Sequence, residues 1–296
     1  MIVADSVAEM VRRRAALDGT GRTIAFVPTM GALHAGHLSL ITLARTLADV
    51  VVVSIFVNPL QFGPSEDYAR YPRPLDADLD ACREEGVDLV FVPSVADLYP
   101  AGRQVTVSAG PMGNLYEGRS RPGHFEGMLT VVLKLFNIVR PQIAVFGQKD
   151  AQQLASVRRM AIDLNLGIEI VGAPTVREPD GLAGSSRNYY LTPAEHLAAL
   201  ALPAALAAGA AEHTPSSALA AAGAIVAAAE SDLIFVLDYL ALVNPATFAQ
   251  VGEDFAGEAL MIIAARVGAT RLIDNAFVTC IAGAIAPAPT HAAISR

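Results

Sequence analysis

The sequence predicts a doubly wound α/β domain built on a parallel sheet, followed by a smaller α+β domain. Strand-like and helix-like segments alternate from about residue 23 to residue 176. The alternation ends near residue 177, where a polar loop begins. Alternation of this kind implies parallel strands joined by right-handed crossovers. The length of 296 residues agrees, because a single domain is typically about 100–200 residues.

The first part of the chain predicts a βαβ unit. Residues 6–17 have helical spacing behind Ser6, a capping residue type, and residues 23–30 form a short, apolar, partly β-branched segment typical of a buried strand. Apolar residues at helical spacing follow over 38–47. Residues 50–58 are a nearly continuous apolar run, as in strands that a parallel sheet buries on both faces.

The alternation then continues beyond a polar, proline-rich loop at 59–74. It predicts helices over 75–86, about 124–139 and 150–165, and strands over 87–94, 142–147 and 168–176. Repeated strand–helix units of this kind indicate a Rossmann-like sheet with helices on both faces.

Past residue 176 a polar loop leads into two alanine-rich helical stretches, 193–211 and 216–230. Three strand-like segments close the smaller domain, at 238–244, 259–267 and 270–278. We therefore expect a first domain at 1–176, a second at 177–281 that includes the loop at 184–188, and a disordered tail at 282–296.

Composition restricts the class of protein. Hydrophobic residues make up 53% and charged residues 17%, which indicates a folded globular chain, and a net charge of −8 argues against a nucleic-acid surface. The N-terminus is unlike a secretory signal, and no apolar stretch is long enough to span a bilayer, so a cytoplasmic location is expected. Cys82 and Cys280, the only cysteines, are too few for a disulfide framework.

Three polar clusters follow predicted strands, at 29–37, 58–63 and 147–150. In a doubly wound sheet, ligands bind at the carboxyl ends of the strands. The three clusters are therefore expected to contribute to one site.

The cluster at 29–37 places His34 and His37 three residues apart between Gly31 and Gly36. Glycines let a backbone approach an anion, and the first turn of a helix offers free N–H groups, so this segment is a candidate phosphate cradle. Either histidine could instead be structural. A metal site is a further alternative and would need a third ligand, for which His124, Glu126 or Asp150 is available.

Lys149 is one of only two lysines in the chain and follows a predicted strand, which suits a point-charge contact to a phosphate. It could also be a surface lysine paired with Asp150. Residues 184–188, GSSRN, offer hydroxyls and a guanidinium for an anion, although serine-rich loops are common. Gln61 and Gln153 are unremarkable by themselves.

Taken together, five segments strongly resemble the pantothenate synthetase (pantoate:β-alanine ligase) family of the nucleotidylyltransferase superfamily. They are VPTMGALHAGHLSLI (27–41), FVNPLQFGPSEDYARYPR (56–73), PGHFEGMLTVVLKLFNIVRP (122–141), FGQKDAQQL (146–154) and VREPDGLAGSSRNYYL (176–191). The H-x-G-H signature of the superfamily is present as residues 34–37. The likeness covers roughly residues 4–280.

The resemblance implies an ATP site and two substrate-binding glutamines. Its catalytic residues would be His34, His37, Lys149, Ser185, Ser186 and Arg187, with acid or proton-donor character at His37. Gln61 and Gln153 would hold pantoate, and Gln61 would also lie at the β-alanine position. The ATP site would comprise Met30, Gly31, Ala32, Leu33, His34, Ala35, Gly36, His37, Gly147, Gln148, Lys149, Asp150, Val176, Gly184, Ser185, Ser186 and Arg187.

The reaction that the resemblance implies has two steps. Pantoate attacks the α-phosphorus of ATP, which arrives with Mg²⁺, to give pantoyl adenylate and pyrophosphate, and β-alanine then displaces AMP. A homodimer is also implied, and no protein-bound metal is expected. The rival hypotheses are another nucleotidylyltransferase, a metal hydrolase built on His34, His37 and His124, and a nucleotide-binding module without catalysis.

The chain departs from the usual family pattern at three positions, Gly184, Gln148 and Ala151. The family usually has methionine where this chain has Gly184, so the loop is expected to be looser. The other two departures remove a charge and an aromatic ring near Lys149.

Overall fold

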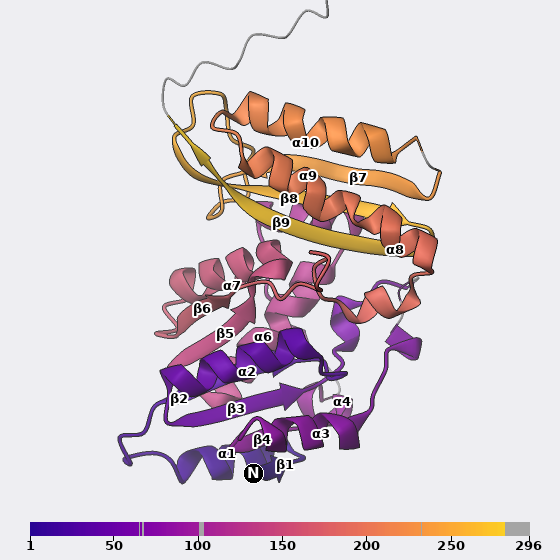
Figure 1. Cartoon of the computed structure of the whole chain (residues 1–296). Coiled ribbons are helices and arrows are strands. Elements are labelled where there is room, and N and C mark those ends of the chain that lie inside the picture. The colour runs from indigo at the N-terminus through magenta and orange to yellow at the C-terminus, as the bar shows by residue number, and fades with distance from the viewer. Residues whose placement is uncertain (65, 67, 101–103, 232, 282–296) are drawn as a thin grey trace, which may run out of the picture. The chain divides into compact units, whose positions relative to one another are not determined.

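The computed structural model describes residues 1–64, 66, 68–100, 104–231 and 233–281. A six-stranded sheet has the strand order β1-β4-β3-β2-β5-β6, and all its strand pairs are parallel (Figure 1). A second sheet has three antiparallel strands in the order β7-β8-β9. The predicted fold class, a doubly wound α/β sheet with a smaller α+β part, is confirmed.

The strands coincide with the predicted segments to within a few residues, with one addition. The parallel sheet contains β1 (Ile2–Ala4), β2 (Ile24–Thr29), β3 (Val50–Ile55), β4 (Leu89–Phe91), β5 (Ile143–Gly147) and β6 (Glu169–Ala173). The edge strand β1 was not predicted, because it is three residues long and two of them are exposed. It is recognisable only through its pairing with β4.

Most helices of the first part follow the predicted pattern, but two four-residue helices, 95–98 and 117–120, were not predicted. They are α1 (Val7–Ala15), α2 (Ala35–Leu47), α3 (Leu75–Glu84), α4 (Val95–Leu98), α5 (Glu117–Ser120), α6 (His124–Val139) and α7 (Ala151–Asp163). Ser6 caps α1 as predicted, because its side chain accepts a hydrogen bond from Glu9 N. The loop between β3 and α3 contains two short 3₁₀ turns, Pro59–Gln61 and Tyr68–Arg70.

Successive residues of β2 pack on opposite faces of the sheet, as expected for a strand buried on both sides. Ala25 and Val27 pack with buried residues of α2 and α3, whereas Ile24 and Phe26 pack with buried residues of α1, α6 and α7. On the second face, Phe136 of α6 makes edge contacts with both Phe26 and Phe146. Two cores therefore hold the sheet between two layers of helices.

The second part of the chain is a three-stranded sheet with helices α9 and α10 on one face (Figure 1). Its elements are α8 (Pro193–Ala199), α9 (Ala201–Ala210), α10 (Pro215–Ala229), β7 (Phe235–Val243), β8 (Gly257–Val267) and β9 (Thr270–Cys280). The first alanine-rich stretch, predicted as continuous, is broken at Leu200. Pro203 explains the break, because proline has no N–H and its ring clashes with the carbonyl four residues earlier.

The contacts divide the chain into residues 1–177 with 184–186, and residues 178–183 with 187–296. This grouping splits the Ser-Ser-Arg loop, since Ser185 and Ser186 group with the first unit and Arg187 with the second. The reason is local, because Gly184 N donates to Val176 O of the first unit.

Within the described part of the chain, no helix combines the length and the apolar character needed to cross a membrane. The cytoplasmic location stays a prediction. The predicted disordered tail, residues 282–296, lies outside the described residues.

Replacement of Phe136 by alanine should destabilise the first unit by about 3–5 kcal/mol, because it leaves a cavity between two aromatic rings. The free energy of unfolding from urea titration measures the effect. Ile162→Ala on α7 is the control, because that side chain is 67% exposed and its loss should cost less than about 0.5 kcal/mol. Equal losses in the two variants would contradict this account of the core.

Candidate active site

The three polar clusters predicted from the sequence follow three strands that are neighbours in the sheet. Strand β2 lies between β3 and β5, and all three run parallel. Residues 29–37, 58–63 and 147–150 come at the carboxyl ends of these strands. The sheet therefore brings the clusters to one edge, where ligands bind in this class of fold.

His34 and His37 form a reciprocal cap at the start of α2. His34 Nδ1 accepts a hydrogen bond from Gly36 N at 3.1 Å, and His37 Nδ1 accepts one from His34 N at 3.4 Å. The centroids of the two rings lie 4.2 Å apart. In a neutral imidazole whose Nδ1 accepts, the proton is on Nε2, so both rings keep an Nε2–H donor.

The surroundings of this pair keep both rings neutral. Burial lowers the pKa of His37 to about 3, and the positive charges of His34 and Lys149 act in the same direction. The pKa of His34 is also lowered, first by burial and then by Lys149, while Asp150 opposes the shift. In the ligand-free protein both residues are therefore hydrogen-bond donors and not imidazolium acids at neutral pH.

The backbone amides of the preceding loop are already engaged. Gly31 N donates to Thr29 Oγ1 at 3.1 Å, and the amides of Ala32 and Leu33 donate to the carboxylate of Asp78 at 2.9 and 2.7 Å. The sequence suggested that glycines here open the backbone to an anion. In this structure those three amides bond to groups of the protein, and the two histidine side chains keep an N–H donor each.

Lys149 lies just after β5 and contacts a second predicted segment. Its Nζ donates to Gly184 O at 3.0 Å, and Gly184 N donates to Val176 O at 2.9 Å. The effect of Lys149 on the pKa of both histidines places its charge near them. Three predicted ATP residues, Val176, Gly184 and Lys149, are thus linked to each other and lie near the histidine pair.

The remaining predicted ATP residues occupy the same segments. Gly147 ends β5, Gln148 is half-buried, and Asp150 is exposed at the start of α7. Ser185 and Ser186 group with the first unit. Arg187 groups with the second unit, and its role stays a prediction.

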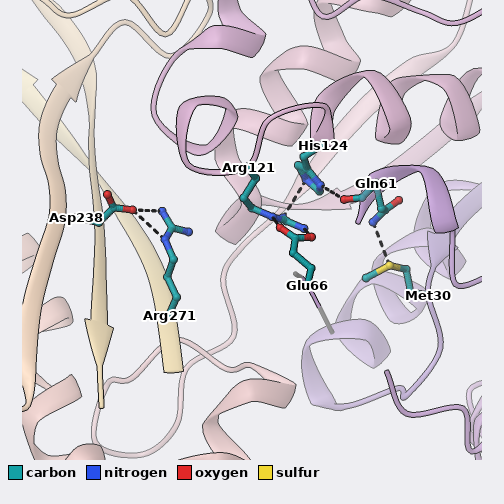
Figure 2. Close-up of polar contacts among 7 residues, drawn as sticks. All are labelled: Met30, Gln61, Glu66, Arg121, His124, Asp238 and Arg271. Atoms are coloured by element: carbon teal, nitrogen blue, oxygen red, sulfur yellow. Dashed lines mark hydrogen bonds and ion pairs between the residues drawn. The ribbon is translucent and has the colours of Figure 1, made fainter. Parts of the chain in front are cut away.

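Gln61 lies at the carboxyl end of β3 and is held by its neighbours. It is 8% exposed, and its Oε1 accepts from Asn58 Nδ2 at 3.0 Å. Its Nε2 lies 3.1 Å from the sulfur of Met30 (Figure 2). Asn58 in turn accepts from Tyr99 Oη at 2.8 Å and donates to Gly127 O. A residue predicted for pantoate and one predicted for ATP, Gln61 and Met30, are therefore in contact.

His124, at the start of α6, supports Gln61 from the other side. Its Nδ1 donates to Gln61 O at 2.9 Å, and its Nε2 accepts from Arg121 Nη1 at 3.1 Å (Figure 2). Arg121 pairs with both carboxylate oxygens of Glu66 at 2.7 and 2.9 Å. Burial, followed by the charge of Arg121, lowers the pKa of His124. Because both of its ring nitrogens are engaged, His124 is unsuited to bind a metal.

Two adjacent glutamines of α7 have different surroundings. Gln152 is buried and bonds Met112 O, Leu115 O and Glu117 N, so its amide is committed to structure. Gln153 is half-buried on the next helical position. The family resemblance implied the substrate role for Gln153, and that role stays a prediction.

Among the described residues, one group of potential metal ligands has suitable spacing: Glu178, Asp180 and His196 in the second unit. His196 Nε2 lies 2.6 Å from Asp180 Oδ2, so the two side chains already satisfy each other. This group contains none of the residues that the hydrolase hypothesis required.

Sequence reasoning did not assign three residues that organise the site: Asn58, Asp78 and His124. Asn58 was only part of a polar cluster, and His124 was considered only as a metal ligand. Asp78 did carry a signal, because its spacing puts it on one helix face with apolar Leu75 and Cys82, where a carboxylate is unusual.

The profile of the Pantoate-beta-alanine ligase family matches residues 2–277 of this chain. The chain belongs to the pantoate–β-alanine ligase family. The pantothenate synthetase of Acidothermus cellulolyticus is 58% identical over 281 residues, covering 93% of this chain and 90% of that protein. That of Thermobifida fusca is 60% identical over 261 residues, covering 85% and 88%.

Solved structures give the same result. The crystal structure of pantothenate synthetase from Thermus thermophilus has a TM-score of 0.86 at 48% identity, covering 93% of this chain and 99% of that one. The pantoate–β-alanine ligase of Francisella tularensis, crystallised with an ATP compound and β-alanine, has a TM-score of 0.78 at 36% identity, covering 93% and 97%. This chain is an ATP-dependent ligase that condenses pantoate with β-alanine.

We expect the imidazole of His37 to stay neutral, with its proton on Nε2, when the ligand-free protein is titrated from neutral pH to about pH 5. The depressed folded-state pKa means that the unfolded chain binds more protons between about pH 6.5 and pH 3, so this residue makes stability fall as the pH drops through that window. Ring nitrogen chemical shifts measured by NMR test the state directly. Shifts typical of imidazolium at about pH 5 would contradict it.

Proposed function

We propose that the ligase reaction of this chain proceeds through pantoyl adenylate. A pantoate carboxylate oxygen attacks the α-phosphorus of ATP, forming one P–O bond while the bond to pyrophosphate breaks. The amine of β-alanine then attacks the activated carbonyl, forming the amide and releasing AMP and a proton. The observation that carries this proposal is the neutral histidine pair beside Lys149 at the carboxyl ends of adjacent strands.

The two histidines and Lys149 suit a phosphate that gains charge during the reaction. Their Nε2–H groups are fixed in direction because each Nδ1 is bonded to a backbone amide. Donors placed before the reaction stabilise developing charge without reorganisation. We therefore assign His34 and His37 to hydrogen-bond donation toward the α-phosphate, and Lys149 to charge compensation. This replaces the proton-donor role that the family resemblance suggested for His37.

Pantoate is proposed to bind beside Gln61 and Gln153. The side-chain amide of Gln61 is held by Asn58 and Met30, and its backbone carbonyl by His124. A substrate group bonded to so constrained an amide is itself held in one orientation, which is the main requirement for in-line attack. Contact between Gln61 and Met30 supports neighbouring positions for the acid and the nucleotide, and β-alanine is proposed to approach on the Gln61 side.

No protein nucleophile is required in this mechanism. Cys82 is fully buried, and burial raises its thiol pKa to about 11, with the charge of Asp78 as a second cause. Burial also raises the pKa of Cys280. Neither thiol is therefore a reactive thiolate.

Magnesium is proposed to enter as part of the Mg·ATP substrate, bound mainly by phosphates and water. The side chains proposed to stabilise the negative charge of pyrophosphate are Ser185, Ser186 and Arg187. Asp150 is proposed to bind the ribose, because its exposed carboxylate can accept hydrogen bonds from hydroxyl groups. The homodimer and the cytoplasmic location stay predictions.

Isotope exchange between pyrophosphate and ATP, in the presence of pantoate and without β-alanine, isolates the first step. Wild-type protein should exchange only with pantoate present, and His37→Ala or Lys149→Ala should lower the rate by about 10²–10³. Arg12→Ala is the control, because Arg12 is an exposed cationic side chain on α1 that pairs with Glu9 of the same helix. Absence of pantoate-dependent exchange in a wild-type protein that forms pantothenate would reject the adenylate.

His124→Leu should raise the KM of pantoate about tenfold and change the KM of ATP by less than about twofold, because it removes the donor to Gln61 O. His124→Asn should restore most of the loss, since its amide nitrogen can occupy the place of Nδ1. Steady-state kinetics with each substrate varied in turn measures the difference. Parallel changes in both KM values would contradict a local role for His124.

A further inference from the structure

Asp78 has no role in the reaction described so far, yet it is one of the most deeply buried acidic side chains in the first unit. It lies in the first turn of α3 and is 3% exposed, whereas Asp76 and Asp80 of the same helix are exposed. Burying a carboxylate is costly unless hydrogen bonds compensate it. Its partners therefore show what the burial serves.

Both oxygens of this carboxylate bond to the loop that precedes His34. Oδ2 accepts from Ala32 N at 2.9 Å and Oδ1 accepts from Leu33 N at 2.7 Å. Gly31 and Ala32 have positive φ angles of 81° and 51°, which turn successive amides toward one side of the loop. Consecutive N–H groups arranged in this way form a concave anion-binding nest, and here the anion is the side chain of Asp78.

The backbone conformation of this loop depends on that contact. A left-handed conformation at Ala32 is disfavoured relative to the ordinary backbone regions, and two charge-assisted hydrogen bonds can offset that cost. Gly31 leaves no room for adjustment, because a Cβ there would lie 2.8 Å from Asp78 Oδ2 and 3.0 Å from Ile55 Cγ2. His34 follows directly, so the direction in which the chain enters α2 is set by the same contact.

We propose that Asp78 is a positioning residue of the ligase. Its carboxylate fills the nest of the Gly31–Leu33 loop and thereby fixes the position and orientation of His34 and His37 relative to ATP. This inference rests on the proposed function of the two histidines. It also explains why the nest is closed to phosphate, which meets the imidazoles and Lys149 instead. A purely structural carboxylate would stabilise the fold without distinguishing between the substrates.

The test is Asp78→Asn, which keeps the shape of the side chain but places an N–H donor against an amide N–H. We expect kcat/KM for ATP in pyrophosphate exchange to fall about 10²-fold, the loss typical of reacting groups displaced by about 1 Å. The KM of pantoate should change by less than about twofold, because Gln61 is held by Asn58, Met30 and His124 instead. Asp76→Asn, on the same helix turn but exposed, should behave as wild type.

Gly31→Ala provides a second variant should Asp78→Asn fold poorly, since its Cβ would press on the same carboxylate from the loop side. Thermal unfolding of each variant measures the fraction of folded protein, and each rate is divided by that fraction. Unchanged ATP kinetics in folded Asp78→Asn would overturn the proposal, as would a lower KM for ATP, which would show that the carboxylate competes with phosphate. Equal decreases in kcat/KM for ATP and for pantoate would show that Asp78 has only a structural role. Wild-type protein without exchange would instead reject the proposed function itself.

Discussion

The two hydrogen bonds that His34 Nδ1 and His37 Nδ1 accept from backbone amides determine what the rest of the site can do. They fix both rings in one tautomer and in one orientation. The start of α2 is thus capped by two imidazoles, whereas most helices are capped by small polar residues. Gly36 makes this possible, because a Cβ at that position would lie 2.9 Å from the ring of His34. The glycine between the histidines thus leaves room for the ring of His34.

The two substrate positions are supported from opposite faces of the sheet. Asp78 belongs to α3, which packs on the face that contains Val27 and Ile41, and it holds the nucleotide loop. His124 belongs to α6, which packs on the face of Phe26, and it holds Gln61. Because the two supports are separate, the proposed roles predict that binding of one substrate can be altered without the other. Parallel sheets allow this arrangement, since helices cover both faces and their ends reach the same edge.

The sequence predicted the parts of this structure that depend on local pattern, and less of those that depend on distant partners. Alternating strands and helices, and the positions of His34, His37 and Lys149 at strand ends, follow from periodicity and sheet topology. The roles of Asp78 and His124 depend on contacts 45 and 63 residues away in the chain, to Leu33 and Gln61. The break at Leu200 was missed because alanine-rich composition outweighed the effect of a single proline.

The departure from the family pattern at Gly184 falls where the backbone, and not a side chain, makes the contacts. Its N–H donates to Val176 O and its carbonyl accepts from Lys149 Nζ, and a Cβ would lie 3.1 Å from Val176 O. The loop is therefore tied down at the position where glycine was expected to loosen it. An ammonium group has three N–H donors. Lys149 can thus keep Gly184 in place and, in the proposed reaction, contact a phosphate oxygen at once, so the charge that is proposed to receive the nucleotide also anchors the segment at 184–186.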